Sequence, residues 1–299
     1  MRIKQYLLAV CIGAMFAACS SKDDFTNEAE RIPIKFSANI QNLIPSVGTR
    51  VGAGTSGLSF TEFPDDSEIS VGFYGSGNSV IKKTDGNWDY TGDKLYFPLS
   101  GEETVIGLYP KQTQSVASVM HGYYSSPTDQ SELSNYQLAD ILGAATTISS
   151  STPDPVSLVF KHLGSKIVVK LSGSSIPSSF TIKMKNIITT GMYGLSGTTL
   201  TINSMYGSNA ITFGNYSSSG QTAIIIPQTI AENTALFEVG TGETTYTYTT
   251  SEAITFKAGH EYTFNFTFSQ TAISLTNVTM TDWGTDPDKS TPIEGNLVK

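Results

Sequence analysis

Leu158–Leu171, with the sequence LVFKHLGSKIVVKL, lies near the middle of the chain, after a run rich in serine, threonine and proline. The apolar residues of its second half recur at every other position: Ile167, Val169 and Leu171. Side chains of a strand point to opposite faces in turn, so this pattern predicts a half-buried strand with Lys166 and Lys170 on the other face. Gly164 breaks the phase and predicts a bulge or tight bend. We interpret the stretch as the first long strand of a second β domain.

The same period of two recurs on both sides of this stretch. In the first part of the chain it involves Ile32, Ile34, Phe36 and Ala38, and in the last part Tyr262, Phe264, Phe266 and Phe268. Strict alternation of four rings predicts that they fill a core, although a sugar-stacking platform is an alternative. No stretch shows a helical period over three turns, and the polar residues 111–135 predict a long surface loop.

Composition and spacing indicate an all-β protein. A chain of 299 residues predicts roughly two domains, and 27 glycines, 12 prolines and only 15% charged residues suit many turns. Short strands separated by turn signals predict a β-sandwich in each half. We place the boundary near Pro155, which gives an N-terminal domain over 32–155 and a C-terminal domain over 156–299.

The N-terminal residues predict export. Two positive charges, Arg2 and Lys4, precede an apolar run that is too short to span a bilayer and ends at Phe16-Ala-Ala-Cys19. We therefore expect residues 1–18 to be a signal peptide, Cys19 to be lipidated and residues 19–31 to form a tether. A spare thiol beside a simple cleavage site is the alternative for Cys19. Without residues 1–18 the chain has 16 basic and 26 acidic residues, a formal charge of −10.

Arginine is confined to the start of the chain. Apart from Arg2, the sequence contains only Arg31 and Arg50, which lie on either side of the first predicted strand. An arginine-specific protease could therefore release the segment up to Arg50 and would find no later site. A chance distribution in an arginine-poor chain is the alternative.

Catalytic patterns are weak, and we predict no enzyme, no metal and no cofactor. His162 is predicted to be a hydrogen-bonded structural histidine. Ser79-Val-Ile-Lys82 matches the S-x-x-K pattern of penicillin-recognising enzymes, but the preceding glycine-rich residues predict a turn where those enzymes have a helix. The aspartates between residues 282 and 288 lack the glycine and the twelfth carboxylate of a calcium loop. A surface hydrolase stays open, because the spacing of a carboxylate pair is spatial.

Two partner classes can be weighed from charge and aromatic content. The formal charge of −8 argues against nucleic acid, because phosphate binding needs clustered lysine and arginine. A surface glycan-binding lipoprotein is an open alternative. It would use exposed rings such as Trp88, Tyr123 and Tyr124.

Taken in order, these features resemble the fimbrillin family, the type V pilins and their relatives in Gram-negative anaerobes. The resemblance covers about residues 19–283. It rests on Cys19, the first strand with the Arg50 loop behind it, Leu158-Val-Phe-Lys-His-Leu-Gly-Ser-Lys-Ile167, Ile225-Ile-Pro-Gln-Thr229, Ala258-Gly-His-Glu-Tyr262 and Thr281-Asp-Trp283.

The resemblance implies two transthyretin-like β-sandwich domains in tandem and a subunit or adhesin of a cell-surface fimbria. It implies export to the outer membrane as a lipoprotein that carries palmitate, followed by a cut at Arg50, or second at Arg31. The released strand would leave a groove that a strand of the next subunit fills, so the partners would be other fimbrial subunits and surface ligands. The polar tail after Trp283 departs from a strongly alternating donor strand.

Overall fold

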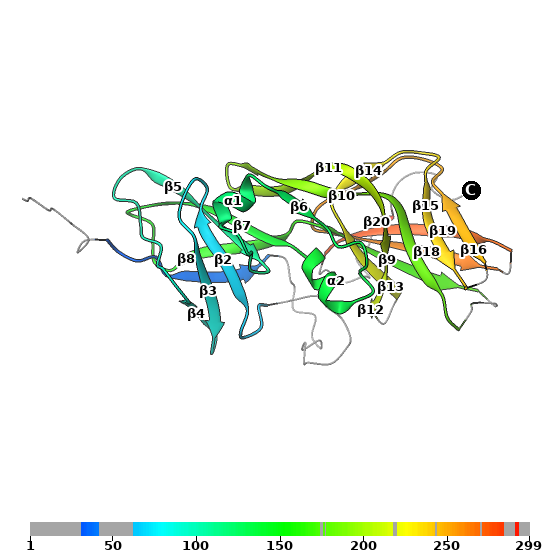
Figure 1. The fold of residues 1–299 in the computed structure, drawn as a ribbon, viewed down its shortest axis with the longest axis horizontal. Helices are drawn as coiled ribbons and strands as arrows, with labels where there is room; N and C mark the ends of the chain where they lie inside the picture. Colours follow the sequence, from blue (N-terminus) through cyan, green and yellow to red (C-terminus); the bar gives the residue numbers. More distant parts are fainter. Residues whose placement is uncertain are drawn as a thin grey trace, which may run out of the picture. The chain divides into compact units, whose positions relative to one another are not determined.

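The computed structural model describes residues 31–41, 62–173, 176, 178–217, 220–242, 244–269, 271–283 and 291–292. Residues 1–32 and 33–299 form two units, and the fold belongs to the second. The described part of this unit is nearly all β-strand, with two short helices (Figure 1). The all-β class is therefore confirmed, whereas the transthyretin-like tandem stays a prediction.

The first half of the unit folds around one seven-stranded sheet with the order β1-β8-β7-β5-β2-β3-β4. Its strands are β1 (Phe36–Ile40), β2 (Glu68–Phe73), β3 (Ser79–Thr84), β4 (Asn87–Tyr90), β5 (Glu102–Tyr109), β7 (Leu142–Ser149) and β8 (Val156–His162). All neighbouring pairs are antiparallel except β1 and β8, which are parallel. The two edges of the sheet approach each other. The Tyr90 hydroxyl at the end of β4 donates a 2.8 Å hydrogen bond to the carbonyl of Ile34, just before β1.

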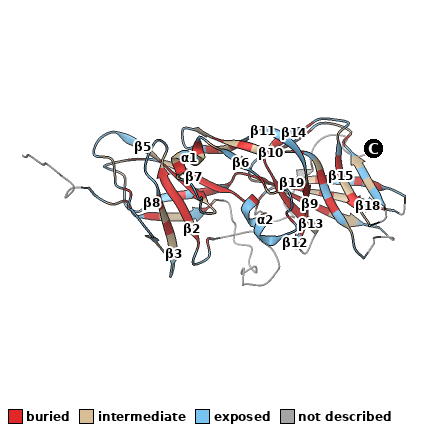
Figure 2. Ribbon diagram, viewed as in Figure 1, coloured by how far each residue is buried: buried red, intermediate tan, exposed pale blue. Residues whose placement is uncertain are grey.

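Alternation within the strands builds the core of this half. In β8 every second residue is buried and the residues between them are exposed. The ring of Phe63 lies at the centre, with its edge or face against Trp88, Tyr109 and Phe160 at centroid distances of 5.1–5.4 Å. Central strands such as β2 are accordingly buried on both faces, while β3 and β4 are partly exposed (Figure 2).

The second half contains three further sheets. The five-stranded sheet has the order β11-β10-β15-β16, with β6 also paired to β10, the six-stranded sheet has the order β12-β13-β9-β18-β19-β20, and β14 pairs with β17. Their strands are β6 (Tyr123–Ser125), β9 (Ser165–Ser172), β10 (Thr181–Ser196), β11 (Thr199–Thr212), β12 (Gly214–Ser217), β13 (Gly220–Ile225), β14 (Gln228–Ile230), β15 (Ala235–Gly240), β16 (Thr245–Thr249), β17 (Ile254–Phe256), β18 (His260–Phe268), β19 (Ile273–Asp282) and β20 (Thr291–Pro292).

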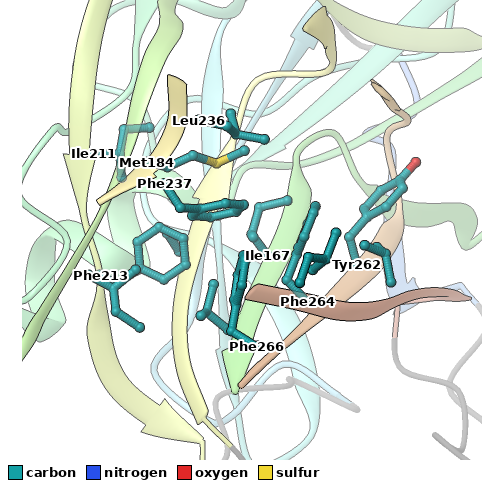
Figure 3. Close-up of a cluster of buried hydrophobic side chains, with 14 of the residues drawn as sticks. Ile167, Met184, Ile211, Phe213, Leu236, Phe237, Tyr262, Phe264 and Phe266 are labelled. Carbon is teal, nitrogen blue, oxygen red and sulfur yellow. The ribbon is translucent and has the colours of Figure 1, made fainter. Parts of the chain in front are cut away.

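Aromatic rings hold these sheets together. Phe237 of β15 and the pair Phe264 and Phe266 of β18 point toward one another from the two larger sheets (Figure 3). The ring of Phe237 lies 4.8 Å from that of Phe264 and 5.5 Å from that of Phe266. All four alternating rings of β18 are buried, so the prediction that they fill a core is confirmed. Each contributes roughly 2 kcal/mol of burial.

The stretch Leu158–Leu171 forms parts of two strands, not one. Residues up to His162 form β8 in the seven-stranded sheet, and β9 begins at Ser165 in the six-stranded sheet. The predicted break at Gly164 is confirmed, and a larger residue would not fit there because its Cβ would lie 2.8 Å from Ile224 Cγ2. The predicted faces of β9 are confirmed, because Ile167, Val169 and Leu171 join one core cluster. The opposite face is more covered than expected, since Val168 is buried and the Lys166 side chain is only 12% exposed. The proposed domain ranges stay a prediction.

Residues 111–135 are more ordered than the predicted surface loop. They contain helix α1 (Val116–Met120), strand β6 and the start of helix α2 (Leu133–Ala139). The Ser115 hydroxyl caps α1 by accepting a 3.2 Å hydrogen bond from the Ser118 amide. Both helices are too short for a periodic signal, and their stability comes from buried side chains such as Val116, Met120 and Tyr136.

A shared apolar cluster connects the two halves. It combines residues of the first sheet, of α1, of the β10–β11 hairpin and of segments that connect strands: Ile106, Leu108, Val116, Met120, Ile141, Leu163, Tyr193, Leu200, Ile202 and Ile226. Gly143 of β7 allows the closest approach, because a Cβ there would lie 2.5 Å from Leu200 Cδ2. The hairpin therefore rests directly on the backbone of the first sheet.

Candidate assembly site

Strand β1 is an edge strand that has the side chains of a core strand. It pairs in parallel register with β8, from Phe36 opposite Val156 to Ile40 opposite Phe160. The Val156 amide donates to the Lys35 carbonyl over 2.8 Å, and the Gln41 amide donates to the Phe160 carbonyl over 2.7 Å. In a parallel ladder, alternate residues turn both backbone groups to the same neighbour, so residues 35, 37, 39 and 41 face β8. The backbone N–H and C=O groups of residues 36, 38 and 40 point to the outer edge of the sheet.

The side chains of this segment enter the hydrophobic core. Ile34 is 0% exposed, Phe36 is 5% exposed and Ile40 is 9% exposed, while Ala38 packs partly buried against the same cluster. Three large buried side chains contribute roughly 6 kcal/mol in total. A short strand is thus held mainly by its apolar face.

The outer edge of β1 faces β4 across an open cleft. The start of the strand is closed by the Ile34 amide, which donates to the Leu95 carbonyl over 2.9 Å, and by the Phe36 ring, which meets the edge of Tyr90 at 6.1 Å. Farther along, a cleft of about 360 Å³ separates the two edges, and its lining includes Ala38, Ile40 and Trp88. No strand covers β1 on this side within the described residues.

Polar contacts fix the entry of β1. The Lys35 amide donates to Asp154 Oδ1 over 3.0 Å, and the Lys35 ammonium lies 3.8 Å from Asp154 Oδ2. Asp154 lies two residues before β8, so this carboxylate fixes the start of both parallel strands. The ion pair is exposed and contributes little by itself.

Removing β1 would create an acceptor groove. Its floor would be the rings of Phe63 and Phe160 and the side chain of Leu158, which belong to the same core cluster as Phe36. Its wall would be the unpaired backbone edge of β8. Exposed apolar surface and open backbone groups together favour the addition of another strand.

The predicted processing and anchoring residues surround this strand in sequence. Cys19 and Arg50 lie outside the described residues, so their predicted roles stay predictions. Arg31 is described and exposed, five residues before the first residue of β1. The two arginines lie on either side of β1. A cut after Arg50 would separate β1 from the rest of the sheet in sequence, and a cut after Arg31 would separate β1 from residues 1–31.

A buried polar cluster gathers residues from three of the motifs that carry the family resemblance. His162 Nδ1 lies 2.7 Å from Asp140 Oδ1, and both side chains are almost fully buried. The His162 ring stacks on Trp283 at 3.8 Å, and the Lys166 ammonium lies 6.0 Å from the Trp283 ring and 2.9 Å from Glu261. His162 is a hydrogen-bonded structural histidine, as predicted. Sequence reasoning missed Asp140, because its partner is 22 positions away.

The electrostatics of this cluster favour a stable ion pair. Burial opposes the positive charge of Lys166, but nearby Tyr136 and Glu261 outweigh it and raise the pKa of Lys166 above its ordinary value. The ammonium therefore stays charged and is a poor nucleophile. We interpret the cluster as a structural clasp between β8, β9, β18 and the end of β19.

The weak catalytic patterns do not assemble into a site. Ser79 and Lys82 lie in strand β3, where the Ser79 hydroxyl donates to the Asp93 carbonyl and the Lys82 ammonium lies 2.8 Å from Asp66 Oδ1. Asp282 ends β19, and the later aspartates lie outside the described residues. The described part of the chain contains no group of three metal-ligating side chains.

The three aromatic residues considered for glycan binding fall into different environments. Trp88 packs edge-on against Phe63, and Tyr124 packs partly buried against the cluster that joins the halves. Tyr123 is 62% exposed. Of the three rings expected to be exposed, Tyr123 is therefore exposed, whereas Trp88 and Tyr124 are partly buried.

Comparison with known proteins gives the family and the fold of the chain. A sequence model described as fimbrillin-like matches residues 57–283. A Bacteroides ovatus protein, proposed to act in cell adhesion, has a similar structure with a TM-score of 0.62 and 20% identity over 86% of this chain and 99% of its own. A Bacteroides uniformis protein with the same proposed role has a TM-score of 0.57 and 15% identity over 85% and 98%. No curated protein sequence matches the chain.

Among the described residues, no helix is long and apolar enough to cross a membrane.

Proposed function

The chain belongs to the fimbrillin-like family, and from this premise we propose that it is a structural subunit or adhesin of a cell-surface fimbria, assembled by protease-triggered strand exchange. The observation that carries the proposal is the position of β1: an edge strand whose apolar side chains complete a core. We infer that the protein is not an enzyme, in keeping with the family.

Export is the first step of the proposed route. The signal peptide of residues 1–18 directs secretion, and acylation of Cys19 holds the precursor on the outer membrane. Two acyl chains on one cysteine are enough for stable anchoring. The acidic surface, with its net negative charge, keeps the precursor soluble at the cell exterior.

Processing is the second step. A cut after Arg50 separates β1 from the segment that leads to β2, and the released strand is then held by its buried side chains and by its pairing with β8. Arg31 is the second candidate. A cut there would free the subunit from its tether and leave β1 in place, so only the cut at Arg50 opens the groove.

Polymerisation is the third step, and the chain itself contains a candidate donor. Strand β1 has the sequence Phe-Ser-Ala-Asn-Ile, and residues 293–297 have the sequence Ile-Glu-Gly-Asn-Leu. Both sequences have a bulky apolar residue, a polar residue, a small residue, an asparagine and an aliphatic residue, in this order. Residues 293–297 of one subunit therefore fit the positions that Phe36–Ile40 of the next would vacate. Residues 293–297 lie outside the described residues, and the proposal rests on their sequence. Because a head-to-tail contact of this kind does not close, it builds a filament.

The test is the mature N-terminus of the protein sheared from its native cell surface, read by mass spectrometry beside an unheated denaturing gel. We expect a start at Val51 and a ladder of stable oligomers. Arg50→Ala should abolish both, and the matched Arg31→Ala should leave both intact. If lipidated Cys19 in an uncleaved monomer is the only surface form, the assembly proposal is wrong.

The donor has its own matched pair. Gly295→Trp should prevent the ladder, because a large side chain cannot occupy the position of Ala38. Glu294→Gln, at a neighbouring position of the opposite face, should leave the ladder unchanged. Equal ladders from both variants would exclude residues 293–297 as the donor.

The second candidate is a glycan-binding lipoprotein that does not polymerise, and the exposure of Tyr123 favours it.

A further inference from the structure

Two exposed tyrosines meet above the middle of strand β10. Strand β6 pairs with one edge of β10, with Tyr123 opposite Met192, and β11 pairs with the other edge, with Tyr206 opposite Thr190 (Figure 1). Cross-strand partners share a face of the sheet, so both tyrosines lie on the same face as Thr190 and Met192. Their rings approach to 5.5 Å at an angle of 67°, although their strands are separated by β10.

The pair is exposed in a way that core rings are not. Tyr123 is 62% exposed and Tyr206 is 53% exposed, whereas the four rings of β18 are buried. Both are placed on paired strands, so their positions are set by the sheet. Because the two exposed rings are adjacent and rigidly placed, they form a candidate binding surface.

The surroundings of the pair are polar but uncharged. Ser125 lies opposite Thr190 on β6, and Asn203 lies opposite Met192 on β11, and both are exposed. These side chains offer hydroxyl and amide groups beside the rings. Thr190, Met192, Ser125 and Asn203 carry no charge, which disfavours an ionic ligand and suits a neutral one.

We propose that the Tyr123–Tyr206 pair is a stacking site for the pyranose ring of a neutral glycan. The apolar C–H face of a sugar packs on an aromatic ring, and its hydroxyl groups reach neighbouring hydroxyl and amide groups, such as those of Ser125 and Asn203. A protein partner fits less well. A fully buried tyrosine covers about 150–250 Å², so two rings provide well under the roughly 800 Å² per partner of a stable protein interface.

This inference goes beyond the proposed function, because it assigns a ligand class to the subunit. It needs neither cleavage at Arg50 nor a donor strand. The test is therefore made on the full-length uncleaved monomer, so that failure of glycan binding and failure of polymerisation are read separately.

The experiment is native affinity electrophoresis in gels that contain a neutral polysaccharide, with xyloglucan, galactomannan and yeast mannan as separate probes, followed by titration of the retarding one. We expect retardation by at least one probe, and a loss of about tenfold in affinity for Tyr123→Ala and for Tyr206→Ala, since a stacked ring contributes up to roughly that factor. Tyr206→Trp should retain binding.

Tyr74→Ala is the matched control, because Tyr74 is also exposed, at 43%, and its ring contacts His121, whereas the rings of Tyr123 and Tyr206 contact each other. It should bind like the unsubstituted protein. Thermal melting of each variant confirms that the fold is intact. Retardation by none of the neutral probes, or equal retardation of the Tyr123→Ala, Tyr206→Ala and Tyr74→Ala variants, would overturn the proposal.

Discussion

The imidazole of His162 stacks on the indole of Trp283 with 3.8 Å between the ring centroids and 11° between the planes. His162 is the last residue of β8, and Trp283 directly follows β19, so the contact joins the seven-stranded sheet to the end of the six-stranded one. The Trp283 amide also donates to the Gly259 carbonyl over 2.8 Å, which fixes the turn before β18. The contact therefore connects the first half of the fold to the second.

We expect His162→Ala to lower the free energy of unfolding by about 3 kcal/mol, because it leaves the buried Asp140 carboxylate without its 2.7 Å partner. Urea unfolding at neutral pH measures the change. His121→Ala is the control, since that ring is exposed, contacts the Ala117 carbonyl over 2.8 Å and the exposed ring of Tyr74 at 5.6 Å, and should change stability little. Equal losses for the two variants would contradict the assigned role of the pair.

Phe36→Ala should weaken the hold on β1 by about 3–4 kcal/mol, because it empties a core position of a strand that has few other anchors. After cleavage by an arginine-specific protease, we expect faster dissociation of the β1 peptide, followed by size-exclusion chromatography with mass detection. Asn39→Ala is the matched control, because its side chain is exposed. Similar dissociation rates for both variants would show that the apolar face does not retain the strand.

Tyr90→Phe should make the seam between β4 and β1 weaker at neutral pH, because it removes the hydrogen bond to the Ile34 carbonyl. Burial raises the pKa of Tyr90 from 10.0 to about 12. Between these values the unfolded state loses the proton that the folded state keeps, so stability falls as pH rises. Tyr90→Phe should therefore lose less stability than the unsubstituted protein between about pH 10 and about pH 12, measured by urea unfolding. An identical pH dependence would refute this.

Gly143→Ala should destabilise the protein by about 1–3 kcal/mol, because the new Cβ would lie 2.5 Å from Leu200 Cδ2 and 2.9 Å from Leu163 Cδ1. The contact between the β10–β11 hairpin and the first sheet would have to open. Gly92→Ala is the control, since a Cβ there would meet nothing within 4 Å. Differential scanning calorimetry should show a lower melting temperature for Gly143→Ala alone.

The positions of individual strands were predicted well, because the alternation of apolar and polar residues depends only on which face of the strand is buried. The four rings of β18 alternate in sequence and are all buried, and the interruption at Gly164 does separate two strands. What lies beyond it could not be predicted, since the sheet that each strand joins depends on partners far away. Lys166 was therefore expected on an outer face, whereas it lies beneath Trp283, which is more than a hundred positions later.

The candidate site was predicted in part for the same reason. The alternation of Ile34, Phe36 and Ala38 indicated a strand, but its parallel pairing with β8 brings together residues about 120 positions apart. Two short helices in residues 111–135 were missed, because they are stabilised by tertiary packing and not by a periodic pattern of their own. Tyr206 was missed because only the approach of β6 to β10 brings it to Tyr123.

The parallel pairing of β1 with β8 also determines how this position resists mechanical force. A strand seated there and pulled along its own length loads all of its bonds to β8 in shear at once, rather than peeling them one by one. A slip of one residue would turn every core side chain outward, so the smallest shift that keeps the faces in place is two residues. The same five positions thus hold a strand firmly against tension along its own length.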